Sequence, residues 1–325
     1  MWCSSALFRM LCTAMLCVAS VTALDSDCAT LWKTKLAESE HAVTVYRQRL
    51  RDSVSKPLAP KSKLDPNEPI WSCESKERVG DNRMSNAPRA PYTRHNAFGD
   101  GPKFMCGVTQ LPRPCLVYNF GSNNDISFER ALHNLTRCEI HTFDPTLRAA
   151  YRGREFSEFH AIGLGAVLRS SGRRGASFKT EQLLTIMKSL GHEGRRIDVL
   201  KIDCEGCEWD ALRPAFEAMK AGSLSIGQLL IEVHAGKSEP QQVYDFFSSA
   251  LDANLRLFSK ERNHWGCDGY KCVEFSFVDK AQACRAFAST HCPREVNSGT
   301  ALNELCGEGP AWRSPSLSPL TSRGQ

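Results

Sequence analysis

Short apolar runs alternate with amphipathic stretches through the middle of this chain. The apolar runs cover residues 116–120, 139–143, 158–162, 197–202 and 226–233. Helical patterns cover residues 126–135, 179–190, 208–221 and 241–253. A strand buried on both faces reads as a nearly continuous apolar run, because helices cover both faces of a parallel sheet. The alternation therefore predicts an α/β domain with a mostly parallel sheet and helices on both faces.

The last two apolar segments of this region, residues 256–260 and 273–278, have no helical pattern between them. Strands that follow one another without a helix are typically joined as an antiparallel pair. We therefore expect an antiparallel hairpin at one edge of the sheet.

The N-terminal residues carry a targeting pattern. Residues 10–24 are apolar and uncharged, and residues 21–23 (Val-Thr-Ala) resemble a small-residue cleavage site. The run is short for a membrane span, which needs about 20 residues. We interpret residues 1–23 as a signal peptide, with an uncleaved signal anchor as the alternative; membrane association is expected only in the second case.

The remaining chain divides by composition. Residues 24–54 predict a helical stalk or packed arm, with Leu36, Val43 and Leu50 at heptad spacing. Residues 55–69 form a Pro-rich linker, residues 70–306 form the main domain, and residues 307–325, rich in Pro and Ser, are expected to be disordered.

Cysteine usage agrees with secretion. The chain has 15 cysteines, of which three lie in residues 1–23. A high count behind a signal peptide indicates disulfides formed in an oxidising lumen, so we expect a secreted protein or one of the ER or Golgi lumen. Asn134-Leu135-Thr136 is a glycosylation sequon.

The spacing of the cysteines suggests three pairs. Cys267 and Cys272 bracket a loop and are expected to pair, and Cys73 with Cys106 would pin the linker to the domain. Cys204-x-x-Cys207 fits a redox pair, half of a zinc site or two structural cysteines, and the compartment favours the structural reading.

Polar residues gather where the predicted strands end. The first strand is followed by Gly121, Ser122, Asn123, Asn124 and Asp125, and the second by Asp144. The fourth is followed by Asp203, Glu205 and Glu208, and the fifth ends in Glu232 and His234. Ligands of open α/β sheets bind at the carboxyl ends of the strands, so these residues are the candidate site.

The nature of the cofactor follows from the first turn. A glycine there allows close backbone approach, and an acid after the second strand, here Asp144, can bind both hydroxyls of a ribose. The turn lacks the G-x-G-x-x-G fingerprint, which disfavours NAD or FAD. S-adenosylmethionine has no phosphate, and the side chains of Asn123, Asn124 and Asp125 could contact its amino-acid part.

The succession LVYNFGSNNDISFERAL, IHTFDPT, AIGLG, IDVLKIDCEGCEWDAL and LLIEVH resembles a methyltransferase-domain family. This family is related to the FkbM-type sugar O-methyltransferases and includes animal secretory-pathway methyltransferase-like proteins. The resemblance implies a Rossmann-like, seven-stranded methyltransferase sheet with S-adenosylmethionine as the methyl donor. It places Gly121 and its neighbours at the cofactor turn and Asp144 at the ribose. It also implies that the segment from Asp203 to Glu208, together with His234, faces the methyl acceptor.

Transfer to a hydroxyl needs a proton acceptor, a role that contributes about 10²–10⁴-fold to rate. We assign this role to His234, with Asp203 or Glu205 orienting it or holding a divalent cation. Glu208 and Glu232 would lie on the substrate or metal side. Their oxygen ligands would favour Mg²⁺, Mn²⁺ or Ca²⁺ over zinc.

The sequence thus predicts a lumenal or secreted S-adenosylmethionine-dependent methyltransferase acting on a glycan or small hydroxylated acceptor. The alternatives are a catalytically weak binding module with the same fold, a NAD-linked enzyme, and a metal-dependent hydrolase using the acids of residues 203–208. The net charge of +5 is modest, and no Lys/Arg run is interleaved with aromatic residues. We therefore expect no nucleic-acid partner.

Overall fold

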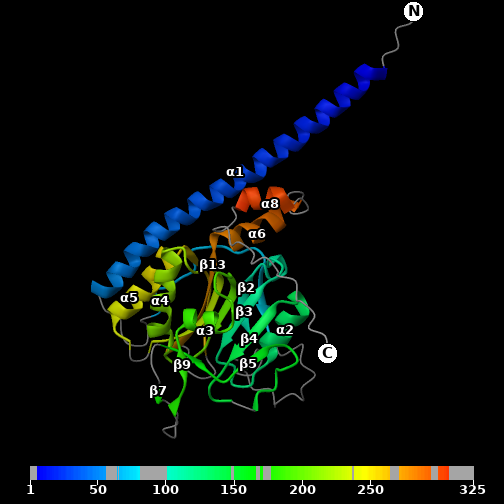
Figure 1. Ribbon diagram of the computed structural model, residues 1–325. Helices are drawn as coiled ribbons and strands as arrows, with labels where there is room; N and C mark the ends of the chain where they lie inside the picture. Colours follow the sequence, from blue (N-terminus) through cyan, green and yellow to red (C-terminus); the bar gives the residue numbers. More distant parts are fainter. Residues whose placement is uncertain are drawn as a thin grey trace, which may run out of the picture.

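The computed structural model describes residues 6–55, 64, 66–80, 101–147, 150–165, 169–170, 177–235, 238–263, 271–293 and 299–306. Its centre is a seven-stranded sheet (Figure 1). The strands are β3 (Leu116–Phe120), β4 (Glu139–Phe143), β5 (Glu158–His160), β10 (Ile197–Ile202), β11 (Ile226–His234), β12 (Leu255–Arg262) and β13 (Cys272–Asp279).

The strand order is β12-β13-β11-β10-β3-β4-β5. All neighbours pair in parallel except β13, which is antiparallel to both β11 and β12. This order confirms the predicted Rossmann-like sheet and its edge hairpin. The chain builds outward from β3 in one direction and from β10 in the other, so the topological switch point lies between these two strands. Ligands of doubly wound sheets bind at this point.

Helices cover both faces of the sheet, as predicted. On one face, Leu200 and Ile202 of β10 belong to the core formed with α3 (Leu183–Ser189), α4 (Glu208–Lys220) and α5 (Pro240–Asp252). On the other, Val199 packs in the core of α2 (Ser127–Thr136). The side chains alternate between faces because successive residues of a strand point in opposite directions.

The predicted helix over residues 179–190 is shorter in the structure. Residues Thr180–Glu181 form a short strand, β9, that pairs in parallel with β6 (Gly163–Leu164). Helix α3 begins only at Leu183. Pairing with a distant segment fixes these two residues in an extended conformation, which a local periodicity cannot reveal. Residues Arg169–Ser170 (β7) and Ser177–Phe178 (β8) form another short pair.

Helix α1 (Ala6–Ser55) extends past the body of the domain (Figure 1). It includes all of residues 24–54, and it packs as an arm, since Val43 and Leu50 are buried in the same core as α5. Arg47 forms an ion pair with Asp252 of α5 at 2.5 Å. Removal of residues 1–23 stays a prediction. Among the described residues, no helix has both the length and the apolar character that crossing a bilayer requires.

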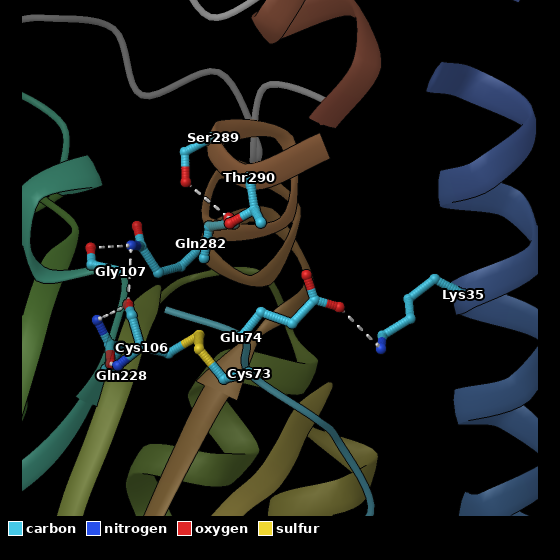
Figure 2. Close-up of a disulfide and its surroundings, with 10 residues drawn as sticks. Lys35, Cys73, Glu74, Cys106, Gly107, Gln228, Gln282, Ser289 and Thr290 are labelled. Atoms are coloured by element: carbon cyan, nitrogen blue, oxygen red, sulfur yellow. Dashed lines mark hydrogen bonds and ion pairs between the residues drawn. A yellow bond between two sulfur atoms is a disulfide. The ribbon is translucent and has the colours of Figure 1, made fainter. Parts of the chain in front are cut away.

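A two-stranded antiparallel sheet, β1 (Lys76–Val79) and β2 (Lys103–Cys106), was not predicted. Figure 2 shows how it docks on the domain. Gln228 of β11 accepts a hydrogen bond from the backbone N–H of Cys106 at 2.8 Å and donates one to its carbonyl at 3.0 Å. Gln282 of α6 (Lys280–His291) donates to the same carbonyl at 3.3 Å and to that of Gly107 at 3.0 Å. These contacts fix β2 against the main sheet, and a disulfide joins β2 to the segment before β1.

The disulfide is the predicted Cys73–Cys106 pair. Cys204 and Cys207 pair with each other. Three further pairs were not predicted: Cys28–Cys292, Cys115–Cys138 and Cys284–Cys306, the last closing onto helix α8 (Gly299–Cys306). Cys272 is also disulfide-bonded, but Cys267 lies outside the described residues, as do most of the linker and residues 307–325.

Candidate functional site

A cavity of about 430 Å³ opens at the carboxyl ends of β3, β4 and β10, beside the switch point of the sheet. This volume falls within the range of about 300–1,000 Å³ that is typical of small-molecule sites. Part of its wall is apolar, with Phe120, Phe143 and Leu164. The polar part comes from the loops that follow the three strands. The cavity therefore offers both an apolar surface and a limited set of polar groups.

The loop after β3 lies very close to the loop after β10. Gly121 has φ +84°, and a Cβ atom there would lie 1.7 Å from the carbonyl oxygen of Asp203. Only glycine fits this position, because both the left-handed backbone and the close approach exclude a side chain. The predicted importance of this glycine therefore has a structural cause, which is the contact between the two loops.

Asp144 shapes the same loop. One of its carboxylate oxygens accepts hydrogen bonds from the backbone N–H groups of Ser122 (3.1 Å) and Asn123 (2.9 Å). The other accepts from the backbone N–H (2.9 Å) and hydroxyl (2.5 Å) of Thr146. Asp144 lines the cavity but is 3% exposed. Its contacts hold two loops in place, in addition to any contact with a ligand.

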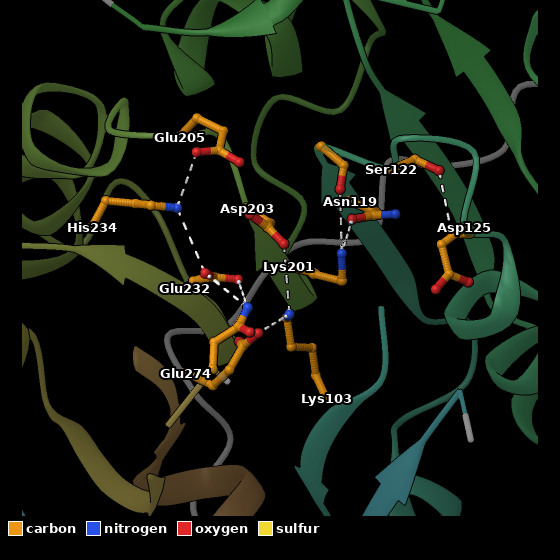
Figure 3. A network of polar contacts seen from close by, with 12 residues as sticks. Lys103, Asn119, Ser122, Asp125, Lys201, Asp203, Glu205, Glu232, His234 and Glu274 are labelled. Atoms are coloured by element: carbon orange, nitrogen blue, oxygen red, sulfur yellow. Dashed lines mark hydrogen bonds and ion pairs between the residues drawn. The ribbon is translucent and has the colours of Figure 1, made fainter. Parts of the chain in front are cut away.

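A buried cluster of charged groups forms the opposite side of the site (Figure 3). Lys103, carried by β2, is ion-paired with Glu274 of β13 and lies 3.7 Å from a carboxylate oxygen of Asp203. Glu232 of β11 accepts hydrogen bonds from the Asn263 amide, with 3.1 Å to each of its oxygens. Several carboxyl groups thus lie close to the ammonium group of Lys103.

Burial and repulsion divide these acids into two classes. Burial raises the pKa of Glu232 well above its usual range, and the neighbouring carboxyl groups of Glu274 and Asp203 add to the rise. Burial also raises the pKa of Asp203, but the positive charges of Lys103 and Lys201 outweigh this effect. The pKa of Asp203 therefore lies below its usual range. At neutral pH, Asp203 is therefore ionised and Glu232 carries a proton.

His234 lies at the end of β11, next to this cluster. Its Nδ1 is 3.0 Å from Oε1 of Glu208, which also accepts the backbone N–H of His234 at 2.7 Å. Its Nε2 points the other way, 3.4 Å from Glu205 and 3.6 Å from Glu232. Trp209 donates a hydrogen bond to the carbonyl of His234 at 3.1 Å. The ring is therefore held at Nδ1 and faces the acids at Nε2.

Glu208 is fully buried, whereas the side chain of Glu205 is 87% exposed. Burial alone would lower the pKa of His234, but the hydrogen bond and charge of Glu208, followed by the charge of Glu205, raise it above its usual value. The K-I-D-x-E-G-x-E-W segment thus supplies both the acid and the indole that hold this histidine. An arrangement of this kind suits a positioned proton acceptor.

Comparison with known proteins assigns the fold to a family. A family model described as "Methyltransferase domain" matches residues 46–279, which is most of the chain. The chain belongs to this family. The methyltransferase domain thus defined contains the whole central sheet, the cavity and the His234–Glu208 pair.

Two curated relatives of the methyltransferase domain are described as "Probable methyltransferase-like protein 24". The rat protein is 32% identical over 127 residues, and the human protein is 30% identical over 128 residues. Each match covers 38% of this chain and 33% of the relative, so the chain matches about a third of the length of these proteins.

Two solved structures show a weak similarity to this chain. Aeropyrum pernix fibrillarin, in complex with S-adenosyl-L-methionine, has 12% identity and a TM-score of 0.32, covering 52% of this chain and 68% of that one. A putative S-adenosylmethionine-dependent methyltransferase from Streptococcus mutans has 9% identity and a TM-score of 0.31. The match covers 52% of this chain and 46% of the Streptococcus mutans chain. The assignment of the fold rests on the order of the strands and on the family model.

The structure brings most of the predicted site residues of the methyltransferase domain to the cavity. Those that line it are Gly121, Ser122, Asn123, Asp125, Asp144, Asp203, Glu205 and Glu232. Asn124 turns away, since its amide bonds the backbone of residues 150 and 152. His234 and Glu208 are not among the lining residues and lie behind Glu205 and Glu232. Glu208, rather than Asp203 or Glu205, is the acid that holds Nδ1 of His234.

Lys103, Glu274 and Lys201 were missed. Lys201 had a signal, because a lysine inside an otherwise apolar strand must find a buried partner. Its Nζ donates to Asn119 at 3.1 Å and lies 3.4 Å from the carbonyl of Gly121. No sequence pattern points to Lys103, because only the docking of β2 on the sheet brings this lysine to the site.

Proposed function

We propose that this methyltransferase domain uses S-adenosylmethionine to methylate a hydroxyl group of a glycan or other small hydroxylated acceptor. The observation that carries the proposal is the buried Glu208–His234 pair beside the cavity. When Nδ1–H of His234 is donated to Glu208, the lone pair of Nε2 is left free on the side of Glu205 and Glu232. A neutral imidazole held in this way can accept the proton of a hydroxyl, directly or through one water.

The cavity suits the cofactor in size and chemistry. S-adenosylmethionine, when bound, supplies a methyl group on a positively charged sulfur. Phe120 and Phe143 offer an apolar wall, Ser122 and Asn123 offer polar groups, and the ionised Asp203 offers a negative charge. Holding donor and acceptor in line can contribute up to about 7–11 kcal/mol to such a transfer.

The raised pKa of His234 determines how the reaction should depend on pH. His234 must be neutral to accept a proton, so turnover is expected to rise with pH through a value above the ordinary histidine pKa. A carboxylate base with a lowered pKa would give its rise at acidic pH instead, because it is already ionised there.

The disulfides support a secretory location. Five pairs lie within the described part of the chain, and one of them, Cys204–Cys207, lines the cavity. Disulfides persist in oxidising compartments and are rare in the cytosol. We place the enzyme in the secretory pathway, as a secreted protein or one of the ER or Golgi lumen.

The test uses the purified full chain with methyl-labelled S-adenosylmethionine and a panel of glycans and glycoprotein fractions. Calorimetry with S-adenosylmethionine and its demethylated product measures binding separately. His234→Gln should reduce labelling at least about 100-fold with little change in cofactor affinity. His41→Gln, on the exposed face of α1, is the matched control.

Three results of this test would contradict or extend the proposal. No binding of either ligand would contradict the enzyme and favour a binding module with this fold. Labelling that survives His234→Gln within about threefold would make His234 a structural histidine. Loss of labelling in a chelator, without a fall in the melting temperature, would show that Asp203, Glu205 and His234, whose ligand atoms lie within 4.8 Å of one another, hold a cation.

A further inference from the structure

Three of the nine histidines meet on the sheet face that is covered by α3, at a distance from the methyl-transfer site. His141 is the central residue of β4, His160 ends the neighbouring strand β5, and His192 lies in the turn after α3. Glu139, at the start of β4, points to the same face as His141, because residues two apart in a strand do so. None of these residues has a role in the proposed methyl transfer.

The geometry points to a zinc site formed by Glu139, His141 and His192. Oε1 of Glu139 lies 3.0 Å from Nε2 of His141 and 3.1 Å from Nε2 of His192. All three ligand atoms lie within 4.8 Å of one another. Ligand atoms of a tetrahedral zinc ion are about 3.3 Å apart, given bonds of about 2.0–2.1 Å. Small shifts of these side chains would admit the ion.

The groups that orient the ligands are also in place. Nδ1 of His192 is 2.7 Å from the hydroxyl of Tyr118, and Nδ1 of His141 is 2.9 Å from Nε2 of His160. Zinc-binding histidines usually donate their other ring N–H to a fixed acceptor, which sets the tautomer and the ring orientation. Both histidines have such a partner on the side away from Glu139.

The ligand set consists of two imidazole nitrogens and one carboxylate oxygen. Imidazole ligands favour zinc over Mg²⁺ or Ca²⁺.

The position is protected but accessible. The side chains of His141 and His192 are 5% and 7% exposed, whereas that of Glu139 is 44% exposed and opens a route to solvent. The other oxygen of Glu139 is bound by Arg195 at 2.7 Å, so one oxygen remains for the ion. A water would complete the coordination, since three protein ligands leave the fourth position open.

The zinc would stabilise the start of β4 and take no part in methyl transfer. It would join the start of β4 to the turn between α3 and β10, whereas the cavity lies at the other end of β4. The rings of Phe143 and Phe120, which stack at 4.4 Å between centroids, line that cavity. Along β4, Glu139 and Asp144 are five residues apart, which is about 16 Å of strand.

The test is metal analysis of the purified full chain, followed by competition titration with Zn²⁺. We expect one zinc per chain. Removal of this zinc by a chelator should lower the melting temperature, and added Zn²⁺ should restore it. His192→Gln removes a ligand and should weaken zinc binding more than about 100-fold. Tyr118→Phe keeps the ring but removes the hydroxyl that orients His192, and should weaken binding about tenfold.

Two control variants identify the site. His41→Gln, on the exposed face of α1, and His234→Gln, in a different group of potential ligands, should both retain wild-type zinc affinity. Should His192→Gln fail to fold, the Tyr118→Phe titration decides. The proposal is overturned if the wild-type chain binds no zinc at micromolar free metal, or if Tyr118→Phe binds zinc with wild-type affinity.

Discussion

Replacing Glu208 with Gln tests the pair on which the proposed function depends. Oε1 of Glu208 lies 3.0 Å from Nδ1 of His234, and the side chain is fully buried. At this separation the attraction between unit charges is about 1.4 kcal/mol in water and about 5.5 kcal/mol at an effective dielectric constant of 20. These limits correspond to about one to four pKa units, and shifts of one to three units are typical for such pairs.

We therefore expect Glu208→Gln to lower the pKa of His234 by about one to three units. NMR titration of the His234 ring measures this without a known acceptor. The glutamine oxygen can still accept both hydrogen bonds from His234, so the ring is retained. The amide nitrogen of the glutamine, however, would face the backbone N–H of Gly206. In the wild-type chain this N–H donates a hydrogen bond to the carboxylate of Glu208 at 2.9 Å. Some loss of stability in this loop is expected.

Glu205→Gln is the matched control. It removes the same charge 3.4 Å from the other ring nitrogen, but from a side chain that is 87% exposed. Solvent screens such a charge, so the pKa of His234 should fall by well under about one unit. A Glu208→Gln shift no larger than the Glu205→Gln shift would refute the argument that the buried acid controls His234.

The same pair predicts how stability depends on pH. The pKa of His234 is raised in the folded chain, so its protonated form stabilises the fold below the unfolded pKa of about 6.5. This contribution is lost as the pH rises through the folded pKa. In Glu208→Gln the difference in stability between acidic and alkaline pH should shrink, as measured by urea unfolding across that range.

Further substitutions test the loops, the buried lysine and the compartment. Gly121→Ala should cost about 3 kcal/mol or more of unfolding free energy, because its Cβ would overlap a carbonyl of the neighbouring loop. Gly206→Ala, whose Cβ meets nothing within 4 Å, should cost only about 1–2 kcal/mol for its left-handed backbone. Asp144→Ala should weaken S-adenosylmethionine binding in calorimetry at least about tenfold, or 1.4 kcal/mol, because the cofactor loop loses the acceptor of its N–H groups; unchanged affinity would contradict this. Lys103→Met should lower the unfolding free energy by about 3–5 kcal/mol, since it leaves buried carboxylates unpaired; a neutral result would show that these acids are protonated. Peptide mass spectrometry of secreted chain should find a glycan on Asn134 and a start near residue 24, whereas a bare Asn134 on a chain that keeps residue 1 would mean a cytosolic protein.

The site shows where prediction from the sequence stops. Asp203, Glu205 and Glu232 could be assigned to one region, because parallel strands bring their carboxyl ends to the same edge of a sheet. The acid that holds Nδ1 of His234 was predicted wrongly as Asp203 or Glu205, since Glu208 lies only three residues beyond Glu205, at the start of α4. The left-handed turn at Glu205 (φ +55°) leaves its side chain in solvent, and Glu208 is buried.

The sequence by itself determined the strands of the central sheet, most of the helices and the strand ends that carry the polar residues. These features follow from local periodicity, which depends on whether each residue faces a core or solvent. Only the tertiary structure decided that β2 carries Lys103 to Asp203, and that His141 and His192 meet across β4 and the turn after α3. Such contacts join residues far apart in the chain, and burial then fixes which of them are charged, so no local pattern could reveal them.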